Sequence, residues 1–131
     1  MTSIGLGRSL WTSPRRGTER VERANVADFV GGWFIGDFHP TMLSTEKFEV
    51  CLKRYAKGER EPLHHQRLAT EFTIVISGRC RIGPHELEPD DILRVDPLEA
   101  AAFEALTDVV LVAVKAPSIT SDKKFGEPQR G

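Results

Sequence analysis

The sequence predicts an all-β fold, a small jelly-roll barrel of about eight to ten short strands preceded by an N-terminal arm. Apolar and polar residues alternate in several segments, and a continuous apolar run covers 109–114. Turn residues such as Gly78 and Gly83 recur between these segments at short intervals. Only about eight residues separate Pro97 from Leu106, which is short for a stable helix, so we expect a strand there as well.

The length and composition fit a single soluble domain. The chain has 131 residues, 40% of them hydrophobic, and a net charge of −1, which suits one core and gives no electrostatic reason to expect nucleic acid as a partner. No stretch approaches the roughly 18 apolar residues of a membrane span, and the N-terminal residues lack the apolar core of a secretion signal. We therefore expect a cytoplasmic protein without a membrane partner, made of an arm (1–24), a barrel (25–116) and a polar surface tail (117–131).

The first predicted strand covers 32–36 and ends in a loop that contains His39. Pro40 follows this histidine and favours an extended conformation for it, either in solvent or facing the site. Cys51 and Cys80 each lie inside a predicted strand, and we interpret them as reduced, buried thiols.

The second predicted strand, 47–55, alternates strictly between two kinds of side chain. One face carries Phe48, Val50, Leu52 and Arg54. An arginine that continues an apolar face needs a reason: Arg54 either extends to the rim or binds an anion inside.

A polar cluster occupies residues 58–78. His64 and His65 open it, and Glu71 begins a strongly β-prone run that Gly78 ends. Two histidines and a carboxylate are thereby brought to the start of adjacent strands. Alternation from Glu71 predicts that the inward residues of its strand are Thr73, Val75 and Ser77. Further strands are predicted at 79–82, 86–88, 92–95, 100–105 and 109–114.

The cluster resembles the first motif of the cupin superfamily, which spaces a glycine, a His-x-His pair, a glutamate and a second glycine at fixed intervals. Gly58, His64, Glu71 and Gly78 stand at these positions, and Gln66 takes the place of the second histidine. The resemblance covers about residues 44–116 and implies a cupin barrel with its site inside. The second motif is degenerate, and Ala101 stands where its histidine is expected.

The resemblance also bears on metal binding. In metal-binding cupins the His-x-His pair, the glutamate and the later histidine hold one divalent ion. Here His64 and Glu71 remain, Gln66 offers a weak amide oxygen, and Ala101 offers nothing. His65 points to the opposite face of its strand unless a bulge intervenes. No cofactor is favoured; if iron, zinc, manganese or nickel is bound, the expected ligands are His64, Glu71 and Gln66.

The leading hypothesis is a metal-independent cupin enzyme that isomerises, cyclises or eliminates a group from a small oxygenated metabolite, such as a sugar derivative or a biosynthetic intermediate. His64 and Glu71 are expected to form its acid–base pair, and Gln66, Arg54 and Thr73 to contact the substrate. Two alternatives stay open: a cupin that binds a small molecule without catalysis, and a metal-dependent, dioxygenase-like cupin with an incomplete ligand set. Exposed strand edges and the arm lead us to expect a homodimer.

Overall fold

The computed structural model describes residues 21–129, and nearly all of their regular structure is β-strand. The arm predicted over residues 1–24 lies mostly outside this range. The elements in chain order are η1 (Val26–Asp28), η2 (Val30–Gly32), β1 (Trp33–Ile35), β2 (Glu49–Tyr55), β3 (Arg60–Gln66), β4 (Thr70–Ser77), β5 (Cys80–Ile82), β6 (His85–Leu87), β7 (Ile92–Val95), β8 (Ala101–Ala105), β9 (Val109–Ala116) and β10 (Lys123–Phe125). Within the described residues no helix is long and apolar enough to span a membrane.

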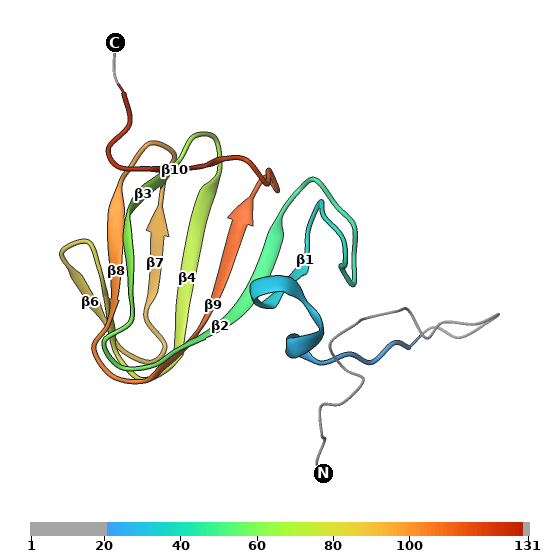
Figure 1. Ribbon diagram of the computed structural model, residues 1–131, viewed down its shortest axis with the longest axis horizontal. Coiled ribbons are helices and arrows are strands. Elements are labelled where there is room, and N and C mark those ends of the chain that lie inside the picture. Colours follow the sequence, from blue (N-terminus) through green and yellow to red (C-terminus); the bar gives the residue numbers. More distant parts are fainter. Residues whose placement is uncertain (1–20, 130–131) are drawn as a thin grey trace.

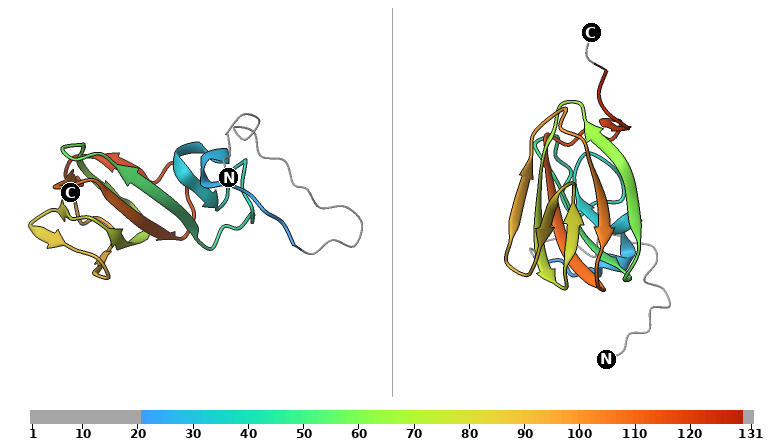
Figure 2. Two further views of the ribbon diagram at one scale, coloured as in Figure 1. Left: turned by 90° about the horizontal axis from the view of Figure 1, so that it is seen from below. Right: turned by 90° about the vertical axis from the view of Figure 1, so that its left-hand side faces the viewer.

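The strands form two five-stranded antiparallel sheets, in the orders β1-β2-β9-β4-β7 and β10-β3-β8-β5-β6 (Figures 1 and 2). The apolar run at 109–116 becomes β9, which lies between β2 and β4 at the centre of its sheet. The alanine-rich segment forms β8 rather than a helix. The predicted all-β jelly roll is confirmed.

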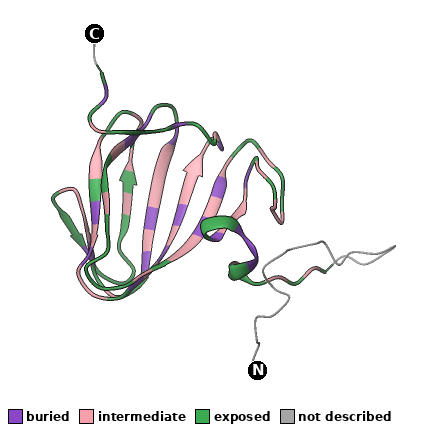
Figure 3. Ribbon diagram, in the orientation of Figure 1, coloured by how far each residue is buried: buried purple, intermediate pink, exposed green. Residues whose placement is uncertain are grey.

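The apolar core lies between the sheets. Its buried members are Cys51, Val75, Cys80, Leu87, Phe103, Ala105, Val109, Leu111 and Ala113. Both cysteines are buried free thiols, as expected. Burial raises the pKa of the Cys51 thiol to about 12 and also raises the pKa of Cys80, so neither is a reactive thiolate near neutral pH. Buried and half-buried residues alternate over 49–52 of β2, 72–75 of β4 and 109–114 of β9 (Figure 3).

The face of β2 that points into the barrel is not the one with the apolar pattern. Cys51 is fully buried and pairs with the buried Ala113 of β9, so the odd-numbered residues of β2 face inward. Arg54 lies on the other face and is exposed. Arg54 therefore does not point into the barrel, contrary to its predicted contact with the substrate, because alternation shows which residues share a face and not which face is inside.

Two other expectations were wrong, one because the pairing of β4 with β9 is irregular and one because an additional strand, β10, pairs with β3. The register of β4 against β9 shifts between Val75 and Ser77, and Ser77 is exposed instead of pointing inward. The segment after Pro117 is not only a surface tail, since β10 crosses one end of the barrel and pairs with β3 (Figure 1).

The C-terminal segment is held to the barrel by a buried carboxylate. Asp122 is 3% exposed and accepts hydrogen bonds from the backbone N–H groups of Leu68 and Ala69. These bonds fix the turn between β3 and β4, the two strands on which most of the predicted site residues lie.

Candidate functional site

The sheets enclose a cavity of about 430 Å³, a size that suits a small metabolite. Strands of both sheets contribute to its wall. Its polar and charged side chains are His39, Glu49, Lys53, Tyr55, Glu61, His64, His65, Gln66, Glu71, Thr73, Glu99, Lys115, Thr120 and Lys123. Four of the five predicted site residues, His64, Gln66, Glu71 and Thr73, are therefore brought together, whereas Arg54 does not line the cavity.

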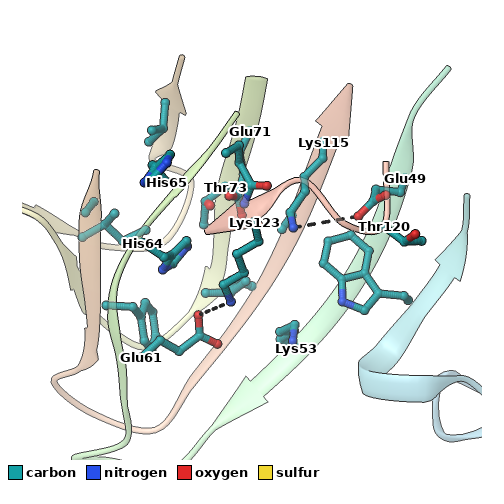
Figure 4. Close-up of a pocket in the computed structure, with 18 of the residues that line it drawn as sticks. Glu49, Lys53, Glu61, His64, His65, Glu71, Thr73, Lys115, Thr120 and Lys123 are labelled. Carbon is teal, nitrogen blue, oxygen red and sulfur yellow. Dashed lines mark ion pairs between the residues drawn. The ribbon is translucent and has the colours of Figure 1, made fainter. Parts of the chain in front are cut away.

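His64 reaches the cavity through an irregularity in β3. The register of β3 against β8 shifts between Glu61 and His64, so both side chains line the same space (Figure 4). The Nδ1 atom of His64 lies 2.9 Å from the carbonyl oxygen of Pro62. Because a carbonyl only accepts, Nδ1 must carry the proton, and in the neutral ring Nε2 keeps a free lone pair.

The neighbouring His65 also lines the cavity, but its ring is anchored. It is buried, and its Nδ1 donates to the carbonyl oxygen of Gly126 at 2.8 Å. This bond ties β3 to the C-terminal segment. His39 lines the cavity as an exposed residue of the loop that follows β1.

Glu71 and Thr73 lie two residues apart on β4 and face the cavity (Figure 4). Neither side chain makes a hydrogen bond or an ion pair with any described residue, and Thr73 is 7% exposed. Glu71 also makes no direct contact of this kind with His64. The two residues share one cavity but do not form the close pair that the sequence suggested.

Gln66 is the most isolated polar side chain of the wall. It is 3% exposed, and within the described residues neither Oε1 nor Nε2 has a hydrogen-bond partner. Buried amides are usually paired, so these two atoms are an exception, and neither is accessible to a molecule in the cavity.

A second cluster, which the sequence did not reveal, joins Tyr55, Glu61 and Lys123. The Tyr55 hydroxyl donates to Glu61 Oε2 at 2.5 Å, and Lys123 Nζ lies 3.9 Å from Glu61 Oε1. Burial and the hydrogen bond to Glu61 raise the pKa of Tyr55 well above its usual value. Burial also acts to raise the pKa of Glu61, but the hydrogen bond and the charges of Lys123, Lys53 and His64 outweigh it, so that pKa is lowered.

The opposite part of the wall carries a further ion pair. Lys115 Nζ lies 3.9 Å from Glu49 Oε2, and the Ser118 hydroxyl donates to Glu49 Oε1 at 2.8 Å. The ammonium groups of Lys115 and Lys53 lie 4.9 Å and 5.8 Å from the centroid of the Trp33 ring. Lys53 makes no ion pair within the described residues. Figure 4 shows the two ion pairs as dashed lines.

The alternation of β2 also offered cavity residues that the sequence analysis missed, on the face opposite Arg54. Glu49, Lys53 and Tyr55 share the inward face with Cys51. A buried cysteine on that face was the available signal. Lys123 gave no signal, because β10 is short and lies in a polar segment.

The donor set does not suit a tightly held transition metal. Ala101 pairs directly with His64 across the β3–β8 ladder, so a methyl group faces the position where a further ligand is needed. The amide of Gln66 is a weak ligand for such ions. Among residues 21–129, no three His, Cys, Asp or Glu side chains are grouped so that they could hold a metal.

No protein-family model matches the sequence, and no curated protein is significantly similar to it. Solved structures are similar in fold. A conserved protein with a double-stranded β-helix domain from Klebsiella pneumoniae has 20% identity and a TM-score of 0.56, with 66% of this chain and 81% of that chain covered. KdgF from Halomonas sp. has 15% identity and a TM-score of 0.54, covering 57% and 74%. The DMSP lyase DddQ from Ruegeria pomeroyi has 13% identity and a TM-score of 0.60, covering 76% and 52%.

These similarities define the class of the fold. The chain is a double-stranded β-helix barrel of the cupin type, as the motif around His64 and Glu71 predicted.

Proposed function

We propose that this protein binds a small oxygenated metabolite in the barrel and moves a proton on it without a metal, in an isomerisation, cyclisation or elimination. One observation carries the proposal: His64, Gln66, Glu71 and Thr73 all line one cavity, and His64, Glu71 and Thr73 carry polar atoms that no described residue satisfies. Buried polar groups are normally hydrogen-bonded. A ligand with several oxygen atoms would supply the missing partners.

His64 is the proposed proton acceptor. The bond from its Nδ1 to Pro62 orients the ring and leaves Nε2 free to take a proton from the substrate. The Glu61 carboxylate, held ionised by Tyr55 and Lys123, interacts favourably with the imidazolium that forms. Glu71 is the proposed second acid–base group, on the facing sheet.

DddQ, one of the similar structures, is a DMSP lyase, and this name is compatible with elimination. Proton transfer to and from a bound substrate is the step that the three reaction types share.

The test is a screen of sugars, sugar acids and small hydroxy acids against the full chain, by thermal shift and ligand-detected NMR. Binders are then incubated with the protein and analysed for products. We expect Ala101→Phe, which fills the cavity, to abolish binding. We expect His64→Ala to lower turnover at least about 100-fold while binding persists. A folded His64→Ala variant with full turnover would overturn the assignment of His64.

A barrel that binds its ligand without catalysis is the second candidate. It is favoured by the absence of a direct contact between His64 and Glu71, since a ready-made acid–base pair would be expected in an enzyme. Binding without product for every ligand found in the screen would support it.

A further inference from the structure

Lys53 is a lysine of the cavity wall that has no carboxylate partner. Among the described residues, the wall contains Lys53 on β2, Lys115 on β9 and Lys123 on β10 (Figure 4). Lys115 and Lys123 are each paired with a glutamate. Lys53 makes no ion pair or hydrogen bond with any described residue. Its ammonium group is therefore left without a direct counter-ion inside the barrel.

The ammonium group of Lys53 is within reach of a ligand. The side chain is only half-buried. Its Nζ atom is not one of the buried polar atoms without a partner, which among the described residues are Asp28 Oδ1 and the two amide atoms of Gln66. Because Lys53 shares the inward face of β2 with Cys51, the accessible ammonium group faces the cavity. The centroid of the Trp33 ring lies 5.8 Å from Nζ.

Glu71, which also lacks an ion pair within the described residues, lies in a different part of the cavity. Lys53 is level with Leu111 of β9, and Leu111 is level with Val75 of β4. Glu71 lies four residues before Val75 on β4. Its Cα atom is therefore separated from that of Lys53 by roughly 10 Å across the sheet and roughly 13 Å along it. The two unpaired charges do not neutralise each other.

We propose that Lys53 binds a carboxylate group of the cavity ligand. The inference rests on the proposed function and names a substrate class for the same site, small organic acids. Only one ammonium group is free, and the nearby Glu61 carboxylate would repel a second negative charge. Among the described residues no arginine, the side chain that binds phosphate with two parallel hydrogen bonds, lines the cavity. A carboxylate with a single charge therefore suits the position better than a phosphate.

The bound carboxylate would lie on the same side of the cavity as His64. The charges of Lys53 and His64 both act to lower the pKa of Glu61, so both groups lie near that carboxylate, where Figure 4 shows them. A carboxylate held by Lys53 would thus anchor the ligand near the proposed proton acceptor. Glu71 stays free for its proposed acid–base role.

The experiment follows the indole N–H signal of Trp33 in ¹H–¹⁵N spectra of the full chain. The chain has two tryptophans, and the signal is assigned from its loss in Trp33→Phe. The probes are L-lactate, its uncharged counterpart lactamide, and inorganic phosphate. We expect lactate to shift the signal at a concentration at least about tenfold lower than the other two. This preference should disappear in Lys53→Gln and persist in Lys53→Arg. The matched control is Arg54→Gln, which removes a charge from the outer face of the same strand and should leave the preference unchanged.

The outcomes separate the two proposals. Equal responses to lactate and lactamide, no response to lactate, a stronger response to phosphate, or a preference that Lys53→Gln retains would each overturn the inference. A neutral sugar that binds in the cavity and is converted would leave the proposed function standing without it. A screen with no binder in the cavity would count against both. The comparison of probes on the wild-type chain decides the inference even if Lys53→Gln does not fold.

Discussion

The sheet β1-β2-β9-β4-β7 has two unlike faces. The inner face carries charges, with Glu49, Lys115 and Glu71 in one row across β2, β9 and β4. The outer face of the same strands is mostly apolar: besides Arg54 and Arg94 it carries Val50, Leu52, Phe72, Ile74, Ile76, Ile92, Val112 and Val114. Ile76 and Ile92 are more than half exposed, at 52% and 63%. In a barrel with a cavity lined by charged side chains, the more apolar face of a strand is therefore not necessarily the inner one.

The glutamates that line the cavity, which come from both sheets, also differ from one another. Glu49 and Glu61 are paired with lysines and receive hydrogen bonds from Ser118 and Tyr55. Glu71 has neither kind of partner among the described residues. Paired charges stabilise the wall, while an unpaired group in a cavity is available for a ligand.

Removing an inner charge should cost more stability than trimming the outer face beside it. In Glu49→Ala, Lys115 is left unpaired with its side chain only 14% exposed, and we expect the free energy of unfolding to fall by about 3 kcal/mol. The control Val50→Ala, the next residue on the outer face, should cost about 1 kcal/mol. Denaturant unfolding measures both, and equal losses would show that the inner pair is not a special source of stability.

Histidines added inside the barrel should create a metal site, whereas a histidine on its outer surface should not. The double variant Gln66→His, Ala101→His completes a set of four ligands with His64 and Glu71, and we expect zinc or nickel to bind at least about 100-fold more tightly than to the wild type. Arg54→His, on the outer face, is the control and should bind no better than wild type. Metal content after dialysis and calorimetry provide the measurement. A wild-type chain that already holds one tightly bound ion would contradict the proposed metal independence.

The smallest expected effect concerns the hydrogen bond from the Tyr55 hydroxyl to the Glu61 carboxylate. The pKa of Glu61 is lowered on folding, so its contribution to stability is present above the unfolded-state pKa and is lost as the pH falls through the folded-state pKa. In Tyr55→Phe the hydrogen bond is removed, so the pKa of Glu61 should rise and acid unfolding should begin at a higher pH. Carboxyl NMR titration and acid unfolding check both; an unchanged Glu61 titration would show that Tyr55 does not stabilise the ionised carboxylate.

Much of the fold and part of the site were predictable from local pattern. Turn residues and alternation indicated the all-β class, motif spacing selected His64, Gln66 and Glu71, and alternation from Glu71 added Thr73; all four line the cavity. Their chemical roles, and the homodimer, remain predictions. Motif spacing works here because strand geometry puts residues at set intervals along the chain on one face.

Where the strands are regular, the sequence by itself determined which residues share a face; the tertiary structure decided which face is inside and where register shifts break the alternation. Lys53 and not Arg54 lines the cavity because β2 pairs with β9 so that Cys51 lies beside the buried Ala113. Glu61 joins His64 through a register shift against β8, and Lys123 joins them because β10 pairs with β3. These choices depend on contacts between residues far apart in the chain, and a period of two is the same for either face of a strand.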